Sequence, residues 1–176
     1  LNLAFVGIEA TYGALAGSMA LLADAGHNLS DVLGLAAAWL GATLGRREPS
    51  PRFTYGLRNS SILAALFNAL LLLVAVGAIA WEAIRRLWAP EPVAGMTMIV
   101  VAGIGIVINA ATAALFASGR KGDLNVRGAW LHMMADAGVS AGVVVTGLVI
   151  LSTGWQWLDP AVSLAIAAFI VWGTWG

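Results

Sequence analysis

The chain has 176 residues, of which 60% are hydrophobic and 10% charged, with a formal net charge of zero and no cysteine. Soluble domains are usually nearer half apolar and a quarter charged, so a soluble fold of this length could not bury so much apolar surface. The composition therefore predicts an integral membrane protein in contact with the lipid bilayer. It excludes disulfides and thiolate metal sites, and it gives no support to nucleic-acid binding.

Six apolar segments predict membrane-crossing helices, each of which needs roughly 20 apolar residues. The breaks between them carry proline, glycine and charged residues, and no loop is long enough for a soluble domain. We therefore expect one all-α polytopic membrane domain over residues 1–176. Because the chain begins with Leu and both ends lie in apolar sequence, we expect it to be a piece of a longer protein. In chain order the segments are Leu1–Ala16, Ser18–Leu44, Ser61–Leu87, Val93–Ala117, Val126–Ser152 and Pro160–Trp175.

Basic residues are distributed unequally between the two sides of the predicted membrane domain. Seven follow the second and fourth segments, whereas Arg85 and Arg86 alone lie on the other side. The positive-inside rule then places the longer basic loops and both ends of the chain in the cytoplasm. The Ala-, Gly-, Trp- and Arg-rich usage favours a bacterial source, so we expect the inner (plasma) membrane of a bacterium. The seven residues are Arg46, Arg47, Arg52, Arg58, Arg120, Lys121 and Arg127.

Four acidic residues and both histidines lie deep within the apolar segments, where no Lys or Arg is placed to pair with them. An ionised carboxylate near the bilayer centre costs about 3 kcal/mol even on lenient insertion scales. An excess of acid without a basic partner favours a bound cation. The six residues are Glu9, Asp24, His27, Asp31, His132 and Asp136.

The spacing of four of these residues predicts a metal site. His27 and Asp31 form the pattern His-x-x-x-Asp, and His132 and Asp136 repeat it on another predicted helix. Residues i and i+4 share one face of a helix, with Cβ atoms about 5–6 Å apart. The second and fifth segments are antiparallel, so His27 should lie near Asp136 and Asp31 near His132. Two imidazoles and two carboxylates suit tetrahedral Zn²⁺.

Three further polar residues are weaker candidates for an ion path or an accessory contact. Asp24 lies one turn before His27, close enough to the predicted outer surface to help an ion leave. Glu9 and Asn109 fit hydrogen bonding between helices as well as the lining of an ion path.

The segment Leu22–Asp31, LADAGHNLSD, resembles the second-helix signature of the cation diffusion facilitators, a family of zinc transporters. Tyr55–Arg58, Ile62–Asn68, His132–Asp136 and the Asp-Pro pair at Asp159 fit the same family, so the resemblance covers nearly the whole chain. It implies a six-helix, dimeric exporter that exchanges cytoplasmic metal for protons, with its transport site at the two His-x-x-x-Asp motifs. Histidine in the second helix is associated in this family with Zn²⁺, often with Cd²⁺ or Co²⁺ tolerated. The family's usual cytoplasmic C-terminal domain is absent from this chain.

Three other functions fit part of the pattern. A passive divalent-cation channel would use the same ligands, although four strong ligands disfavour fast release. A membrane cytochrome with His27 and His132 as axial haem ligands would give the neighbouring acids no role. An intramembrane zinc protease needs a His-Glu-x-x-His motif that the chain lacks, and a two-aspartate protease leaves the histidines unused. We therefore expect a transporter and not an enzyme.

Overall fold

Six α-helices make up the part of the chain that the computed structural model describes, residues 2–45 and 60–175. Each observed end lies within two residues of the predicted end, which confirms the six helices expected from the sequence. Four arginines that supported the predicted orientation, and the Tyr55–Arg58 stretch of the family resemblance, lie outside the described residues. The helices are α1 (Asn2–Ala16), α2 (Met19–Gly45), α3 (Ser60–Trp88), α4 (Gly95–Phe116), α5 (Leu124–Thr153) and α6 (Leu158–Trp175).

Three of the helices are long and apolar enough to cross a membrane on length and composition alone. They are α3, α4 and α5, whose most apolar stretches of 18 residues have mean hydropathies of 2.7, 2.3 and 1.9. Helix α6 is apolar but shorter. Helix α2 has 27 residues, but its apolar run is interrupted by Asp24, His27 and Asp31. The fold is therefore an all-helical membrane domain with three clear spanning candidates among its described residues.

Local sequence signals set the ends of the helices. Gly17 adopts a left-handed φ of 65° and reverses the chain between α1 and α2. Asp123 caps α5 by accepting hydrogen bonds from the backbone N–H groups of Asn125 (2.7 Å) and Val126 (3.3 Å). Gly154, with φ of 76°, ends the same helix. These short turns make sequential helices antiparallel neighbours.

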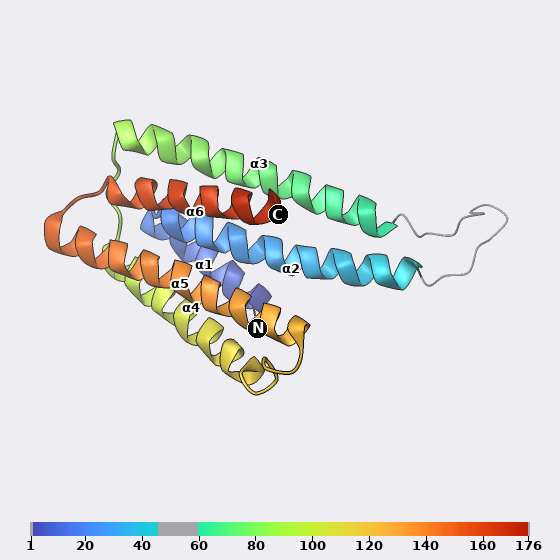
Figure 1. The fold of residues 1–176 in the computed structure, drawn as a ribbon. Coiled ribbons are helices and arrows are strands. Elements are labelled where there is room, and N and C mark those ends of the chain that lie inside the picture. The colour runs from blue at the N-terminus through green and yellow to red at the C-terminus, as the bar shows by residue number, and fades with distance from the viewer. Residues whose placement is uncertain (1, 46–59, 176) are drawn as a thin grey trace.

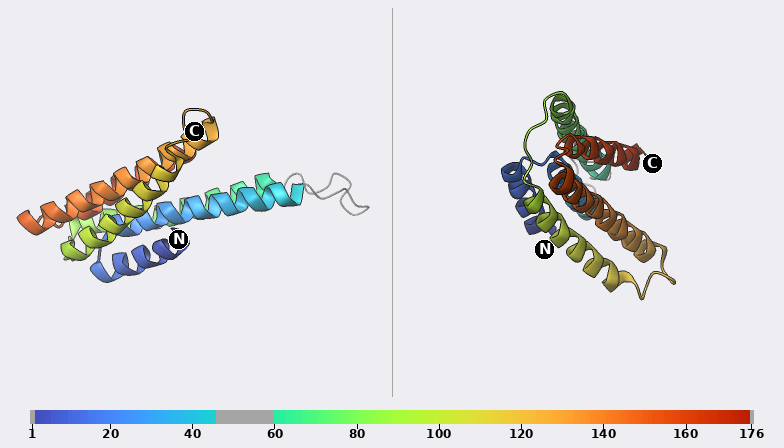
Figure 2. Two further views of the ribbon diagram at one scale, coloured as in Figure 1. Left: turned by 90° about the horizontal axis from the view of Figure 1, so that it is seen from below. Right: turned by 90° about the vertical axis from the view of Figure 1, so that its left-hand side faces the viewer.

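Helix α2 lies at the centre of the bundle, in contact with α1, α3, α5 and α6, as the views in Figures 1 and 2 agree. Helices α4 and α5 pack tightly along each other. A Cβ atom added at Gly147 would lie 2.8 Å from Ile99 Cγ1 and 3.1 Å from the carbonyl oxygen of Gly95, so only glycine fits there. Figure 2 shows the α4–α5 pair diverging from the α2–α3 pair toward the end where α4 and α5 are joined.

Hydrogen bonds tie the loops together at the opposite end of the bundle. Asp159, fully buried in the first turn of α6, accepts hydrogen bonds from Ser18 Oγ (2.6 Å) and from the backbone N–H groups of Met19 (2.6 Å) and Ala20 (3.2 Å). A carboxylate from one helix therefore caps the start of another.

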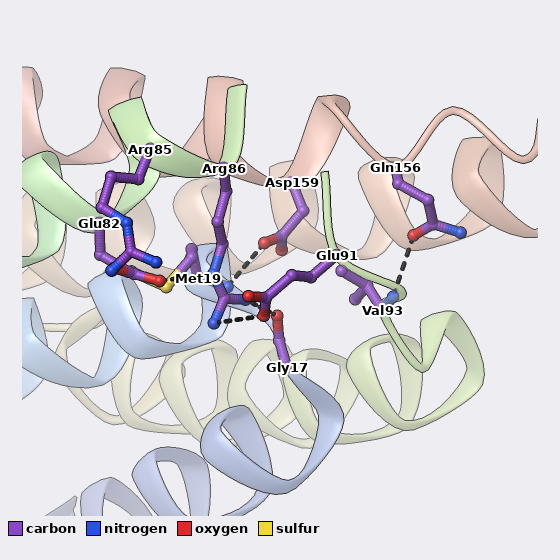
Figure 3. Close-up of polar contacts among 9 residues, drawn as sticks. All are labelled: Gly17, Met19, Glu82, Arg85, Arg86, Glu91, Val93, Gln156 and Asp159. Atoms are coloured by element: carbon purple, nitrogen blue, oxygen red, sulfur yellow. Dashed lines mark hydrogen bonds and ion pairs between the residues drawn. The ribbon is translucent and has the colours of Figure 1, made fainter. Parts of the chain in front are cut away.

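Arg86, near the end of α3, adds a second set of contacts at this end (Figure 3). Its guanidinium donates to the carbonyl of Gly17 at 2.6 Å and pairs with Glu82 and Glu91, each at 3.0 Å. The loops after α3 and α5 are joined by the backbone N–H of Val93, which donates to the side-chain oxygen of Gln156 at 3.0 Å. The helices are thus held together at this end and diverge at the other.

Candidate metal centre

The structure brings the four predicted ligands together where α2 faces α5. His27 Nε2 lies 3.3 Å from Asp136 Oδ1 and 3.9 Å from Asp31 Oδ2. His132 Nε2 lies 3.2 Å from Asp31 Oδ2 and 3.7 Å from Asp136 Oδ2. Each histidine therefore faces both carboxylates, and the closer partner is on the other helix, the pairing expected for antiparallel helices.

Three atoms of this cluster are buried without a hydrogen-bond partner: His27 Nε2, Asp31 Oδ2 and Asp136 Oδ1. One ligand atom from each of these residues lies within 4.8 Å of the other two. A tetrahedral Zn²⁺ with bonds of about 2.0–2.1 Å holds its ligand atoms about 3.3 Å apart, close to the nitrogen–oxygen distances across the two helices. Unpartnered polar atoms are costly to bury, and a bound cation would offset that cost.

The four side chains differ in exposure. Asp136 is 3% exposed, His27 12%, Asp31 27% and His132 43%. Asp31 and His132 also line a cavity of about 1390 Å³ that lies between the diverging helix pairs, bordered by Ala38 and Gly128 among others. An ion arriving through this cavity would meet Asp31 and His132 first, and His27 and Asp136 after them.

All four ligands border a smaller cavity of about 200 Å³, which Phe169 of α6 helps to close. The ring of Phe169 packs edge-on against His27, with centroids 6.1 Å apart. The aromatic ring restricts the orientation of the imidazole and fills space beside it. The chamber next to the ligands is therefore shaped by four helices, α2, α3, α5 and α6, with Leu72 supplied by α3.

The three weaker candidates occupy different positions. Asn109 is 6% exposed and borders a cavity of about 60 Å³ together with Asp31, His132 and Asp136. Glu9 and Asp24 are both fully buried and make hydrogen bonds to neighbouring helices instead. Asn109 is placed to line an ion path, and the other two are placed in the packing between helices.

Two polar residues next to the ligands were missed in the sequence analysis. Asn28 donates its amide N–H to Glu9 Oε2 at 3.0 Å, and Ser140 donates its hydroxyl to Asp24 Oδ2 at 2.9 Å. Ser140 follows Asp136 by four residues, so its position on the same face of a helix was a signal that could have identified it. Asn28, a polar residue inside an apolar segment, was the second such signal.

The geometry favours a small ion over a haem group. The rings of His27 and His132 have centroids 6.2 Å apart. Carboxylate oxygens of Asp31 and Asp136, at 3.2 to 3.9 Å from the two Nε2 atoms, occupy the space beside them that a macrocycle would need. The arrangement suits a cation that accepts two nitrogen and two oxygen ligands.

Comparisons with known proteins agree with this chemistry. The family profile described as the cation efflux transmembrane domain matches residues 1–176. Zinc transporter ZitB of Escherichia coli (strain K12) is 39% identical over 172 residues, 97% of this chain and 55% of that protein. Metal cation efflux system protein CzcD of Cupriavidus metallidurans is 36% identical over 171 residues, 97% of this chain and 54% of that protein. The cadmium, cobalt and zinc/H⁺-K⁺ antiporter of Bacillus subtilis (strain 168) is 38% identical over 166 residues, 93% of this chain and 53% of that protein. The chain spans about half the length of these curated relatives.

Proposed function

The chain belongs to the cation efflux family, which confirms the resemblance seen in its sequence, and we propose that it exports divalent metal ions. Its main substrate is Zn²⁺, with Cd²⁺ and Co²⁺ tolerated, and the counter-ion is the proton. The observation that carries this proposal is the convergence of three buried, unpartnered ligand atoms, from His27, Asp31 and Asp136, beside His132. The names of these relatives support the metal class, and one of them includes a proton counter-ion.

The four ligands suit the binding and the release of a dication. Two ionised carboxylates balance the charge of Zn²⁺, and two neutral imidazoles complete a tetrahedron. Protons compete with the metal for the same nitrogen and oxygen atoms, so metal binding releases protons and a rise in proton concentration releases metal. Exposure of the site first to one side of the membrane and then to the other would turn this competition into exchange.

We place all six helices in the membrane as one domain, residues 1–176. Helix α2 contacts four other helices, including the spanning candidates α3 and α5, and so shares their depth. Arg120, Lys121 and Arg127 lie at the connection between α4 and α5, and the positive-inside rule assigns this end to the cytoplasm. Both ends of the chain then face the cytoplasm of a bacterium, and the large cavity receives cytoplasmic metal.

We further propose that the protein acts as a homodimer, which the family resemblance implies. Chemical cross-linking in the membrane would detect a species of twice the chain mass. Full transport activity in proteoliposomes that hold at most one chain per vesicle would refute this assembly.

Transport in proteoliposomes tests the proposed function. With an acidic interior, outward proton flow should drive saturable uptake of Zn²⁺, and Asp31→Ala should abolish it. Asp123→Asn is the matched control: it removes a carboxylate from the α5 cap, where Asn is an equally good cap, and transport should continue. Flux that neither saturates nor depends on the proton gradient would favour the passive channel. No Zn²⁺ flux in the parent protein would refute the proposal.

A further inference from the structure

A second pair of acidic residues lies beside the candidate metal centre and makes its own hydrogen bonds to neighbouring helices. Glu9 of α1 and Asp24 of α2 are both fully buried, with 0% of their surface exposed. Their carboxyl groups lie within hydrogen-bonding reach of each other. Two carboxylates held together inside apolar helices repel each other and lose their hydration, so an arrangement with both ionised is costly.

In each carboxyl group one oxygen accepts a hydrogen bond from a neighbouring side chain, and the other oxygen has no such donor. Asn28 donates to Glu9 Oε2 and Ser140 donates to Asp24 Oδ2, and both donors are neutral. Glu9 Oε1 and Asp24 Oδ1 are buried and have no such donor. Ionised carboxylates are acceptors only, so the two groups can hydrogen-bond each other only when one of them carries a proton.

The helices packed against Glu9 carry no lysine or arginine among their described residues that could replace that proton. Helix α1 contacts α2 and α4, and α4 contains no ionisable residue. From α2, Asp24 faces Glu9, and His27 lies one turn further on; from α5, Asp136 acts on Asp24. On α1 itself the other ionisable side chain is Tyr12, which is 46% exposed. Since Asn28 and Ser140 present donors, only two free oxygens remain, too few ligands for a divalent ion.

We propose that Glu9 and Asp24 hold one proton between them, and that this proton leaves to water when Zn²⁺ binds at the neighbouring four-ligand site. The inference rests on the proposed function and assigns part of its proton exchange to residues that do not touch the metal. The step balances: a proton and a dianionic pair form from the singly protonated pair, and the charge of the incoming dication compensates the added negative charge.

The coupling is electrostatic and acts in both directions. Asp24 carries its charge close to His27 and Asp136. A dication at these ligands cancels the negative charge of Asp136 that otherwise repels a second anion at Asp24, and so favours loss of the proton. By linkage, a proton returning to the pair weakens metal binding by the same factor. Protonation of the pair therefore lowers the affinity of the site for metal, as an exchanger of metal for protons requires.

Infrared difference spectroscopy of the purified protein in lipid nanodiscs, with and without Zn²⁺, tests this inference. The parent should lose the C=O stretching band of a protonated carboxylic acid when Zn²⁺ binds, and a pH indicator should record the released protons. Glu9→Gln, which mimics the protonated group, should lack the band and release up to about one proton fewer per Zn²⁺. Glu91→Gln is the matched control because Glu91 is exposed and paired with Arg86; it should behave as the parent.

The outcomes separate this inference from the proposed function. If the parent binds Zn²⁺ but Glu9→Gln shows the same band and the same proton release, the shared proton is refuted while the metal site stands. If neither the parent nor any of the variants binds Zn²⁺, the proposed function itself fails. Should Glu9→Gln not fold, Glu9→Asp keeps an acid in place and should shift the band; an unshifted band would assign the proton elsewhere and overturn the inference.

Discussion

Asp136→Asn is the substitution that most directly tests the metal centre. Asp136 is the most buried of the four ligands, and its two oxygens face His27 at 3.3 Å and His132 at 3.7 Å. Asparagine keeps the size and shape of the side chain but removes the charge that balances the dication. Because Asp136 Oδ1 is buried without a hydrogen bond, and burying a charge is costly without metal, the metal-free variant should unfold no more easily than the parent.

The expected size of the effect follows from the role of a direct ligand. Loss of a residue that merely supports a ligand typically weakens metal binding 10- to 100-fold, so loss of the ligand itself should raise the Zn²⁺ dissociation constant about 100-fold or more. At a Zn²⁺ concentration of 100 times the parent's dissociation constant, binding stabilises the parent by about 2.7 kcal/mol. The same concentration should stabilise Asp136→Asn by only about 0.4 kcal/mol.

Calorimetric titration and thermal unfolding with and without Zn²⁺ measure these quantities. Asp123→Asn makes the same chemical change at the α5 cap and should retain the full Zn²⁺-dependent stabilisation. The reasoning fails if Asp136→Asn binds Zn²⁺ as tightly as the parent. It also fails if both variants lose binding equally, since the effect would then not belong to the site.

Three further substitutions test other contacts. His27→Asp replaces an imidazole by a harder oxygen ligand and should weaken discrimination against Mn²⁺; an unchanged ratio of Zn²⁺ to Mn²⁺ transport in proteoliposomes would contradict the selectivity argument. Asp159→Ala leaves a buried hydroxyl and two backbone N–H groups at the start of α2 without their acceptor, so thermal unfolding should show a loss of about 2 kcal/mol or more. Melting like the parent would refute the capping role. Gly147→Ala brings a methyl group within 2.8 Å of α4 and should cost about 1–3 kcal/mol. Gly138→Ala, which meets no atom within 4 Å, is its control; equal melting of the two variants would contradict the tight packing.

The helices and the pairing of the four ligands were predictable because both follow from local periodicity. Apolar length and turn residues set the six segments, and the spacing of four residues placed each histidine and aspartate on one face. The antiparallel direction of α2 and α5 then fixed which histidine met which acid. No long-range geometry was needed for these steps.

The contacts between distant segments were not predictable in the same way. The hydrogen bond between Asp159 and Ser18 joins residues 141 positions apart, and the sequence analysis named Asp159 only as part of an Asp-Pro pair that fits the family resemblance. The meeting of Glu9 with Asp24 depends on how α1 crosses α2, which hydrophobic periodicity does not specify. The difference in exposure between His132 and Asp136 likewise depends on the divergence of the α4–α5 pair from α2.

The turn at Gly17 has a mechanical consequence for transport. Only two residues join α1 to α2, and they reach at most about 7 Å when extended, while hydrogen bonds from Gly17 N to Ala14 O and from Ser18 N to Gly13 O hold them folded. The two helices therefore cannot slide along each other and must travel as a single rigid hairpin. During the motion that carries an ion from one side of the membrane to the other, Glu9 therefore keeps a constant distance from His27 and Asp31, the two ligands on α2.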